Sequence, residues 1–161
     1  MHMAAAGLLA PWDSVQCAAQ TAGRGQLRRT WHSPPGNVYA ALRLPLEAPF
    51  DGSAAAPAAA LLLAGSLRML GWPVRLKWPN DIVLEGKDGQ PRKLAGILLE
   101  ERGGVLLAGM GINVTFAPPA AALRTGAAME ATCLKSSPGG AGGWYISTAE
   151  AIWQQLVKHM Y

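Results

Sequence analysis

Apolar residues alternate with polar or small residues in several short runs of this chain, which is the spacing of strands that bury one face. The clearest run is 37–44 (NVYAALRL), in which every second side chain is apolar. Further runs bounded by turn-forming residues predict strands at 14–19, 74–77, 82–84, 94–100 and 105–114. Glycine, proline, asparagine and aspartate separate these runs, so we expect turns at 79–81, 86–90 and 102–104.

Two segments have the features of helices. Ser53 is a candidate N-cap for a helix that runs to Leu70, with Pro57 in its first turn. In the C-terminal segment 147–159, Ser147 or Thr148 is the candidate cap. The apolar face of this second helix is formed by Ile152, Leu156 and either Val157 or Trp153.

The remaining segments complete the expected fold. We expect residues 4–9 to be the end of a helix, and the proline- and glycine-containing stretch 115–143 to be a long connection with a short helix. One helix that crosses over a largely antiparallel set of strands predicts the fold class α+β.

The composition is that of a single globular domain. The chain has 161 residues, 50% of them hydrophobic and 15% charged, so a core can form. Its net charge of +4 favours an anionic partner, which leaves a nucleotide, a nucleic acid or an acidic protein open. Cys17 and Cys133 have no zinc-site spacing and form no disulfide framework, which indicates a cytoplasmic location, and we expect Cys17 to be buried in its strand. The longest apolar run, 54–65, is shorter than the about 20 residues of a membrane span, and the N-terminus has no signal-peptide pattern.

The loop 20–36 is the first candidate site. Gly23 and Gly25 flank Arg24, so backbone N–H groups and a guanidinium are available to an anion at one place. Trp31 adds a flat apolar wall. The alternative is a solvated basic loop with Trp31 in the core.

The second candidate is the segment Lys77-Trp-Pro-Asn-Asp81. Pro79 fixes the backbone, so Lys77, Asn80 and Asp81 project in a fixed relation to one another. Asp81 is a candidate to accept a proton or orient an amine, and Lys77 to offset a negative charge. The alternative is a turn with one incidental ion pair.

The third candidate consists of 93–97 (KLAGI) and 109–113 (GMGIN). Lys93 begins a strand and is followed by small residues, which leave room for a ligand against the backbone. Gly111 lies inside a predicted strand, where glycine often marks a close approach. The alternative is a surface lysine and a bulge.

Together these segments resemble the catalytic domain of biotin protein ligases, in the biotin/lipoate protein ligase family. The resemblance runs from about residue 14 to 114 and is carried by QTAGRGQLRRTWHSPPGNVYAAL, VRLKWPNDIVLEGKDGQPRKLAGILLE and GMGINV. It implies a mixed, mainly antiparallel sheet with helices packed on one side, akin to the class II aminoacyl-tRNA synthetase core. It also implies ATP, Mg²⁺ and biotin as reactants, a biotinyl-5′-AMP intermediate, and a lysine of a biotin carboxyl carrier protein, such as an acetyl-CoA carboxylase subunit, as acceptor.

The resemblance implies catalytic roles for three residues. Arg24 is the expected anion clamp, Lys93 lies at the carboxylate and α-phosphate, and Asp81 faces the phosphates, Mg²⁺ or the incoming lysine. No residue is assigned as a direct metal ligand. The other residues implied to bind biotin or nucleotide are Gln20, Gly23, Gly25, Trp31, Lys77, Asn80, Leu94, Gly96, Gly111 and Asn113.

The sequence differs from the family pattern in the loop 20–36 and at the N-terminus. Gln26 stands where the family has an arginine that retains the adenylate, and Arg28 stands at a usual glycine position. The family's Ser-Thr-Asn motif is missing, so we expect residues 1–161 to form one catalytic-core-like domain, N-terminally shortened and lacking the C-terminal β-barrel. An adenylate-binding protein without turnover and a lipoate or octanoate ligase stay open as alternatives. We expect no nucleic-acid or membrane partner, and a homodimer formed by sheet extension is possible.

Overall fold

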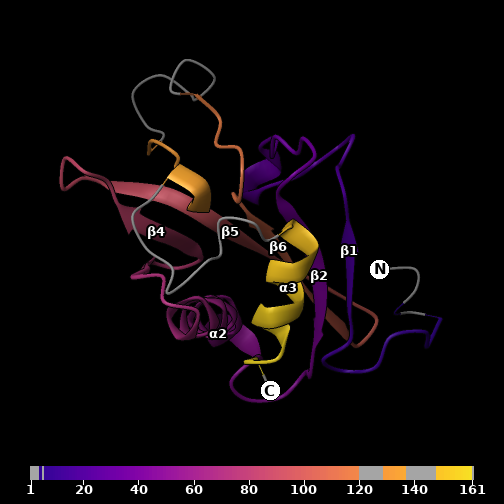
Figure 1. Cartoon of the computed structure of the whole chain (residues 1–161). Coiled ribbons are helices and arrows are strands. Elements are labelled where there is room, and N and C mark those ends of the chain that lie inside the picture. Colours follow the sequence, from indigo (N-terminus) through magenta and orange to yellow (C-terminus); the bar gives the residue numbers. More distant parts are fainter. Residues whose placement is uncertain (1–3, 5, 120–128, 137–147, 161) are drawn as a thin grey trace.

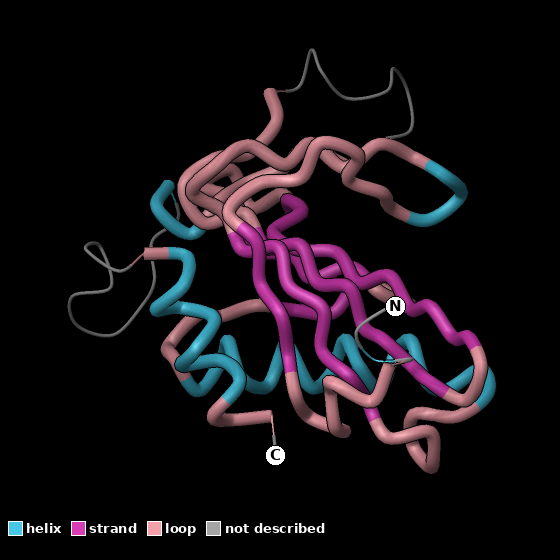
Figure 2. Tube along the Cα trace, turned by 90° about the vertical axis from the view of Figure 1, so that its right-hand side faces the viewer, coloured by secondary structure: helices cyan, strands magenta, loops and turns pink. Residues whose placement is uncertain are grey.

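Six strands form one antiparallel sheet in the computed structural model, which describes residues 4, 6–119, 129–136 and 148–160 (Figure 1). Neighbouring strands follow the order β1-β2-β6-β5-β4-β3. The strands are β1 (Ser14–Cys17), β2 (Val38–Leu44), β3 (Arg75–Lys77), β4 (Asp81–Glu85), β5 (Pro91–Arg102) and β6 (Val105–Ile112). The helices α2 (Ala55–Met69) and α3 (Ala149–Val157) lie on one side of the sheet (Figure 2), which confirms the α+β prediction.

One face of the sheet and the two helices share the main hydrophobic core. The sheet contributes alternate residues such as Leu42 of β2 and Met110 of β6, and the helices contribute residues such as Leu63, Leu67 and Leu156. These side chains are at most 2% exposed. Since each buried leucine contributes roughly 1.5–3 kcal/mol relative to an exposed one, this face fixes which side of every strand points away from the helices.

The helix α2 lies close to the sheet because its inner face is built from small side chains. Ala59, Ala60 and Ala64 are fully buried. The predicted cap was wrong: the N-cap is Ala54, without a side-chain hydrogen bond, and Ser53 belongs to a preceding 3₁₀ turn, Gly52–Ala54. The 3₁₀ turn satisfies part of the helix N-terminus through the backbone, so no side-chain cap is needed.

The helix α3 has the predicted cap and face. The Thr148 hydroxyl accepts a hydrogen bond from the Ala151 N–H at 3.1 Å. Ile152, Trp153 and Leu156 are buried. The Trp153 Nε1–H donates to the Ser14 hydroxyl at 3.1 Å and so ties the C-terminal helix to β1. The alternative cap, residue 147, lies outside the described residues.

The predicted turns at the two hairpins are confirmed. In the hairpin between β4 and β5, the Gly86 N–H donates to the Gln90 carbonyl at 2.8 Å. Between β5 and β6, Gly103 and Gly104 have φ of 59° and 73°, a conformation that favours glycine. In the described part of the long connection, the predicted short helix is the 3₁₀ helix η4 (Leu134–Ser136).

Two local predictions were wrong. Residues 6–7 form a turn, so the helix expected to reach Leu9 stops earlier, and Ala4 and Leu9 pack instead against Val105 and Leu107. Cys17 is exposed rather than buried, because β1 is an edge strand and Cys17 is its last residue. Among the described residues, no helix is both long and apolar enough to cross a membrane.

Candidate functional site

A row of cross-strand partners defines the candidate site. Tyr39 of β2 lies opposite Gly111 of β6, Gly111 opposite Gly96 of β5, and Gly96 opposite Asp81 of β4. The neighbours of Gly111 in the chain, Met110 and Ile112, point into the helix-side core, so this row lies on the other face of the sheet. Two facing glycines leave a flat floor in the middle of it.

The indole of Trp31 lies directly on this floor. A Cβ atom added to Gly111 would be 2.6 Å from Trp31 Cε2, and one added to Gly96 would be 3.2 Å from Trp31 Cζ3. A contact under 3 Å is too close for real side chains, so only glycine at 111 allows the indole to lie there. The alternative of a solvated basic loop stays open, because Arg24 and Arg29 are exposed, but Trp31 packs on the face of the sheet opposite the main core.

The loop 20–36 is folded back on itself and carries Trp31 to this place. The Trp31 N–H donates to the Gly23 carbonyl at 2.9 Å, and a Cβ at Gly23 would be 2.4 Å from the Trp31 carbonyl oxygen. The Gln20 side-chain oxygen accepts a hydrogen bond from the Ser33 hydroxyl at 2.8 Å. Gly23 and Gln20 therefore shape the loop that holds the indole.

A β-bulge brings Lys93 to the same face as Gly96. Residues three apart on a regular strand point to opposite faces. In β5, however, Ala95 pairs with Ile82 and Lys93 with Val83, so Leu94 is an extra residue without a partner on β4. The extra residue shifts the alternation by one, and a Cβ at Gly96 would be 3.3 Å from Lys93 Cε.

The Lys93 ammonium lies between an acidic and an aromatic side chain. Its Nζ is 2.6 Å from Asp81 Oδ1 and 5.3 Å from the centroid of the Trp31 ring. The side chains of Lys93 and Asp81 are 28% and 20% exposed, so this ion pair is partly shielded from water. Among the described residues, Trp31 Nε1 is a buried donor without a hydrogen-bond partner.

Other predicted site residues are placed in the structure as follows. Arg24 is exposed and forms a backbone bridge with Thr30, next to the Gly23–Trp31 contact, while the Gly25 N–H donates to the Arg29 carbonyl at 2.7 Å. Lys77 is exposed and lies opposite Asp81 at the end of β3. The loop and the Lys77–Asp81 pair thus lie around the glycine floor, and their predicted ligand contacts stay predictions.

Three predicted ligand contacts belong to buried residues. The Asn80 side chain donates to the Ile97 carbonyl at 2.7 Å, and the Asn113 side chain donates to the Thr132 carbonyl at 3.1 Å. Leu94 is fully buried in the main core. These side chains hold the backbone around the site in the structure, and their implied contacts with biotin, nucleotide and phosphate stay predictions.

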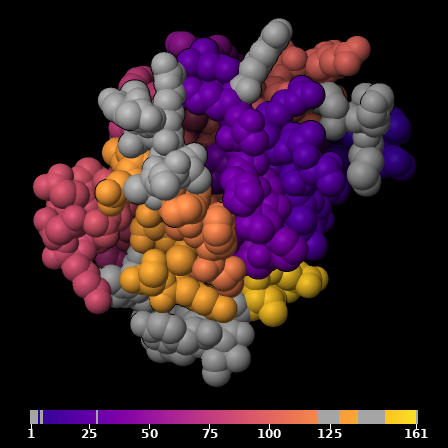
Figure 3. Space-filling model, turned by 90° about the horizontal axis from the view of Figure 1, so that it is seen from above, coloured from indigo at the N-terminus to yellow at the C-terminus, as the bar shows by residue number. Residues whose placement is uncertain are grey.

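Sequence reasoning missed Asn37, the residue before β2. Its side-chain oxygen accepts hydrogen bonds from the N–H groups of Val114, Thr115 and Phe116 at 2.9, 3.0 and 3.1 Å. Its amide donates to the Phe116 carbonyl at 2.9 Å. Seen from above in Figure 3, violet atoms of the N-terminal third of the chain lie beside orange atoms of the later part of the chain. A single asparagine before a strand does not indicate from the sequence that its side chain will bind the backbone of a distant segment.

Tyr39, the residue of the row on β2, was also missed. It is 2% exposed, and its hydroxyl donates to the Pro34 carbonyl at 2.8 Å, so it fixes the loop above the sheet. Burial raises the pKa of the Tyr39 phenol above its ordinary range; Cys17 adds to the rise, and a hydrogen bond with Asn37 opposes it.

The fold and the site together define an α+β domain whose sheet face opposite the helices carries a lysine and a glycine floor covered by an indole. The chain belongs to the Biotin/lipoate A/B protein ligase family, whose sequence profile matches residues 13–116.

Named relatives agree with this family. The chain is 38% identical over 125 residues to the biotin–[acetyl-CoA-carboxylase] ligase of Paracoccus denitrificans, covering 70% of this chain and 49% of that protein. It is 41% identical over 119 residues to the bifunctional ligase/repressor BirA of Escherichia coli K12, covering 67% of this chain and 35% of that protein. The chain therefore spans half or less of the length of these relatives.

Solved structures share the fold. The biotin protein ligase from Aquifex aeolicus in complex with biotin and ATP has a TM-score of 0.67 at 24% identity, with 91% of this chain and 58% of that chain covered. The biotin protein ligase from Leishmania major in complex with biotinyl-5-AMP has a TM-score of 0.64 at 26% identity, with 91% and 62% covered.

Proposed function

We propose that this chain is the core of a biotin–carrier-protein ligase. It would activate biotin with ATP to biotinyl-5′-AMP and transfer biotin to a lysine of a biotin carboxyl carrier protein. The observation that carries the proposal is the placement of the Lys93 ammonium against Asp81 and Trp31, beside Gly96. Named relatives at 38–41% identity that are called ligases support it.

The first step joins two anions, biotin and ATP. The positive charges of Lys93 and Arg24 would stabilise this step. A biotin carboxylate oxygen attacks the α-phosphorus of ATP, and pyrophosphate leaves. Lys93 would offset the negative charge that builds up on the phosphoryl oxygens, an effect of the kind that preorganised charges provide. Arg24, on the exposed loop beside the Gly23–Trp31 contact, would hold the second anionic group.

The second step needs a base rather than a cation. The carrier lysine must lose a proton before its amine attacks the carbonyl carbon of the mixed anhydride, with AMP as the leaving group. Asp81 is the carboxylate nearest to Lys93 in the described part of the chain, so it would orient the amine and accept its proton.

Magnesium would enter with ATP rather than as a resident ion. Among the described residues, no three His, Cys, Asp or Glu side chains are grouped so that they could hold a metal. One carboxylate, Asp81, faces the floor, which fits a cation whose other ligands are phosphate oxygens and water. Mg-ATP would therefore be the substrate.

Binding without turnover is the second candidate function. Gln26, which stands where the family has an adenylate-retaining arginine, is exposed on the loop. In this alternative biotin, an adenylate or another acyl group such as lipoate binds over the floor, but no product forms. We propose a cytoplasmic location in either case, and a homodimer formed by sheet extension would use β1 or β3, the outer strands of the described sheet.

The test is incubation of the purified chain with biotin, Mg-ATP and a carrier domain, with a full-length relative as positive control. Biotin transfer to the carrier, followed by mass spectrometry, supports the ligase. Pyrophosphate release without transfer supports the first step alone. Biotin binding in calorimetry without pyrophosphate release supports the second candidate and contradicts the ligase. Light scattering in the same buffer reports whether the chain is a monomer or a dimer.

A further inference from the structure

A short strap, which we define as residues 130–134, pairs with the backbone of Lys93. The Lys93 N–H donates to the Glu130 carbonyl at 2.7 Å, and the Thr132 N–H donates to the Lys93 carbonyl at 2.9 Å. This is the pattern of a parallel bridge, here between Lys93 and Ala131. Lys93 is thus held between Val83 of β4 on one side and the strap on the other.

The strap lies where β5 and β6 separate. The last partners of the two strands are Ala95 and Ile112, so β6 offers Lys93 no partner. Asn113 continues the contact from β6 to the strap: its side chain donates to the Thr132 carbonyl at 3.1 Å, and its carbonyl accepts from the Leu134 N–H at 3.0 Å. The strap therefore fills the gap that the divergence leaves beside Lys93.

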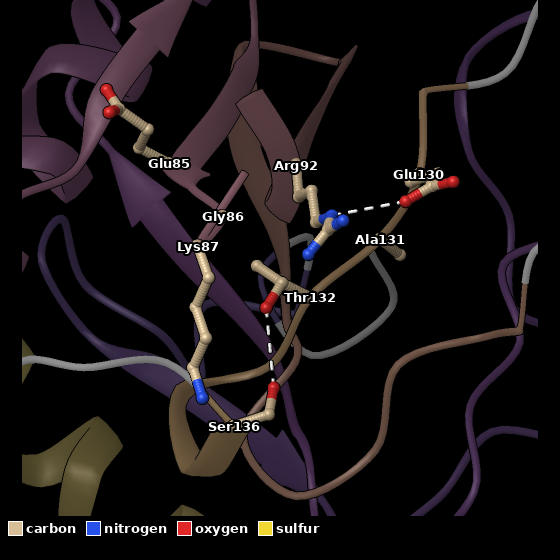
Figure 4. Close-up of a pocket in the computed structure, with 8 residues that line it drawn as sticks. All are labelled: Glu85, Gly86, Lys87, Arg92, Glu130, Ala131, Thr132 and Ser136. Atoms are coloured by element: carbon tan, nitrogen blue, oxygen red, sulfur yellow. Dashed lines mark hydrogen bonds and ion pairs between the residues drawn. The ribbon is translucent and has the colours of Figure 1, made fainter. Parts of the chain in front are cut away.

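Arg92 ties the strap to the sheet. Its Nε is 3.1 Å from Glu130 Oε2 of the strap, and a terminal nitrogen is 2.8 Å from Asp88 Oδ2 of the β4–β5 hairpin. Figure 4 shows the ion pair between Arg92 and Glu130 as a dashed line. Both residues line a pocket of about 400 Å³, together with Thr132 and Ser136. Arg92 precedes Lys93 in β5, so it holds the strap next to the residue that the strap supports.

We infer that the strap positions Lys93, and that Arg92 and Glu130 are positioning residues that act through it. This inference rests on the proposed function for its catalytic consequence. The bulge at Leu94 places Lys93 on the site face, but it also leaves the backbone there without a regular ladder on both sides. The strap replaces the missing ladder and so keeps the Lys93 ammonium at Asp81 and Trp31.

The experiment compares four charge variants of the full chain. Arg92→Gln removes both ion pairs, and Glu130→Gln removes only the one to the strap. Asp88→Asn is the control matched to Glu130→Gln. It also removes one of the two carboxylate partners of Arg92, but it leaves the ion pair between Arg92 and Glu130 of the strap intact. Arg75→Gln removes the ion pair between Arg75 of β3 and Glu85 of β4, neither of which belongs to the strap.

Two measurements need no turnover. Hydrogen exchange at the Lys93 and Thr132 amides should be about 2–5-fold faster in Arg92→Gln and Glu130→Gln, since an ion pair of this kind shifts local opening by that order. Acetylation of Lys93 Nζ by an N-hydroxysuccinimide ester, followed by peptide mass spectrometry, should also rise a few-fold in these two variants. Arg75→Gln and Asp88→Asn should stay within about twofold of the unaltered chain in both measurements.

Unchanged exchange and unchanged acetylation in Glu130→Gln would overturn the inference. An effect of Asp88→Asn as large as that of Glu130→Gln would overturn it too, because the hairpin rather than the strap would then hold Lys93. For Arg92→Gln and Glu130→Gln, the kcat of pyrophosphate release should fall 3–10-fold, while the KM for biotin should not change. A chain without any turnover contradicts the proposed function, while exchange and acetylation still decide the role of the strap.

Discussion

Gly96 and Gly111 face each other on β5 and β6, and the indole of Trp31 covers both. Gly111→Ala should displace this indole, because the new methyl group would lie 2.6 Å from Trp31 Cε2. We expect a loss of about 1–3 kcal/mol in the free energy of unfolding and a large loss of biotin affinity, measured by urea unfolding and calorimetry. Gly109→Ala is the matched control, since its nearest neighbour is the Leu98 carbonyl at 3.3 Å rather than Trp31. Equal biotin binding by both variants would contradict a ligand site over the floor.

Lys93→Met should lower adenylate formation by about 10²–10³-fold, the range found when one preorganised charge is removed from a transition state. Methionine keeps an apolar chain against Trp31 and Gly96 but carries no charge. The measurement is pyrophosphate release with biotin and Mg-ATP. Lys158→Met, at the exposed end of α3, is the control. Pyrophosphate release at the unaltered rate in Lys93→Met would remove Lys93 from the mechanism.

Gln26→Arg should slow the release of biotinyl-5′-AMP by about tenfold, since one additional charge-assisted contact to the phosphate is worth roughly 1.4 kcal/mol. The side chain is exposed on the loop that carries Trp31, so the larger residue fits without repacking. Release is measured by chasing labelled adenylate with unlabelled ligand. Gln26→Ala is the control and should release the adenylate at the rate of the unaltered chain.

Asn37→Ala should lower the free energy of unfolding by about 2–4 kcal/mol, because it leaves several buried backbone groups without partners. The three N–H groups that donate to Asn37 and the Phe116 carbonyl that accepts from it all lose a bond. Thr115→Val is the control at the same joint: it removes one exposed hydroxyl bond to Gly36 and should cost less than about 1 kcal/mol. Urea unfolding of the two variants gives the comparison.

The raised pKa of Tyr39 predicts a loss of stability in alkali. The folded state holds the phenolic proton more tightly than the unfolded state does, so the contribution is complete below the ordinary pKa of about 10. It is lost as the pH rises from there through the raised pKa. Unfolding free energies measured from pH 9 to 11 should therefore fall more steeply in the unaltered chain than in Tyr39→Phe. Equal slopes would show that the burial of this phenol has no such effect.

Much of the site was visible in the sequence as isolated motifs. The glycines of the loop and of 109–113, the lysine at 93 and the aspartate at 81 were each singled out because their residue types suit anions and close approach. What the pattern did not show was that Trp31 would lie on Gly96 and Gly111. That contact joins three segments of the chain, and local spacing contains no information on such a distance.

Because of the β-bulge, the face of the sheet on which Lys93 lies could not be predicted from the sequence. Regular alternation along β5 would place Lys93 and Gly96 on opposite faces, and the prediction of a plain strand contains no bulge. The strap was also invisible, because its hydrogen bonds to Lys93 and Asn113 are mostly made by backbone groups, which every residue possesses. Similarly, the exposure of Cys17 follows from the position of β1 at the sheet edge and not from its own pattern.

The sequence by itself determined the strands, the two helices and the charges available to a ligand, since periodicity and residue type are local properties. Only the tertiary structure decided which strands pair, in what register, and on which side of the sheet Lys93, Asp81 and Trp31 meet. Register depends on hydrogen bonds between residues far apart in the chain, and a shift of one residue moves a side chain to the other face.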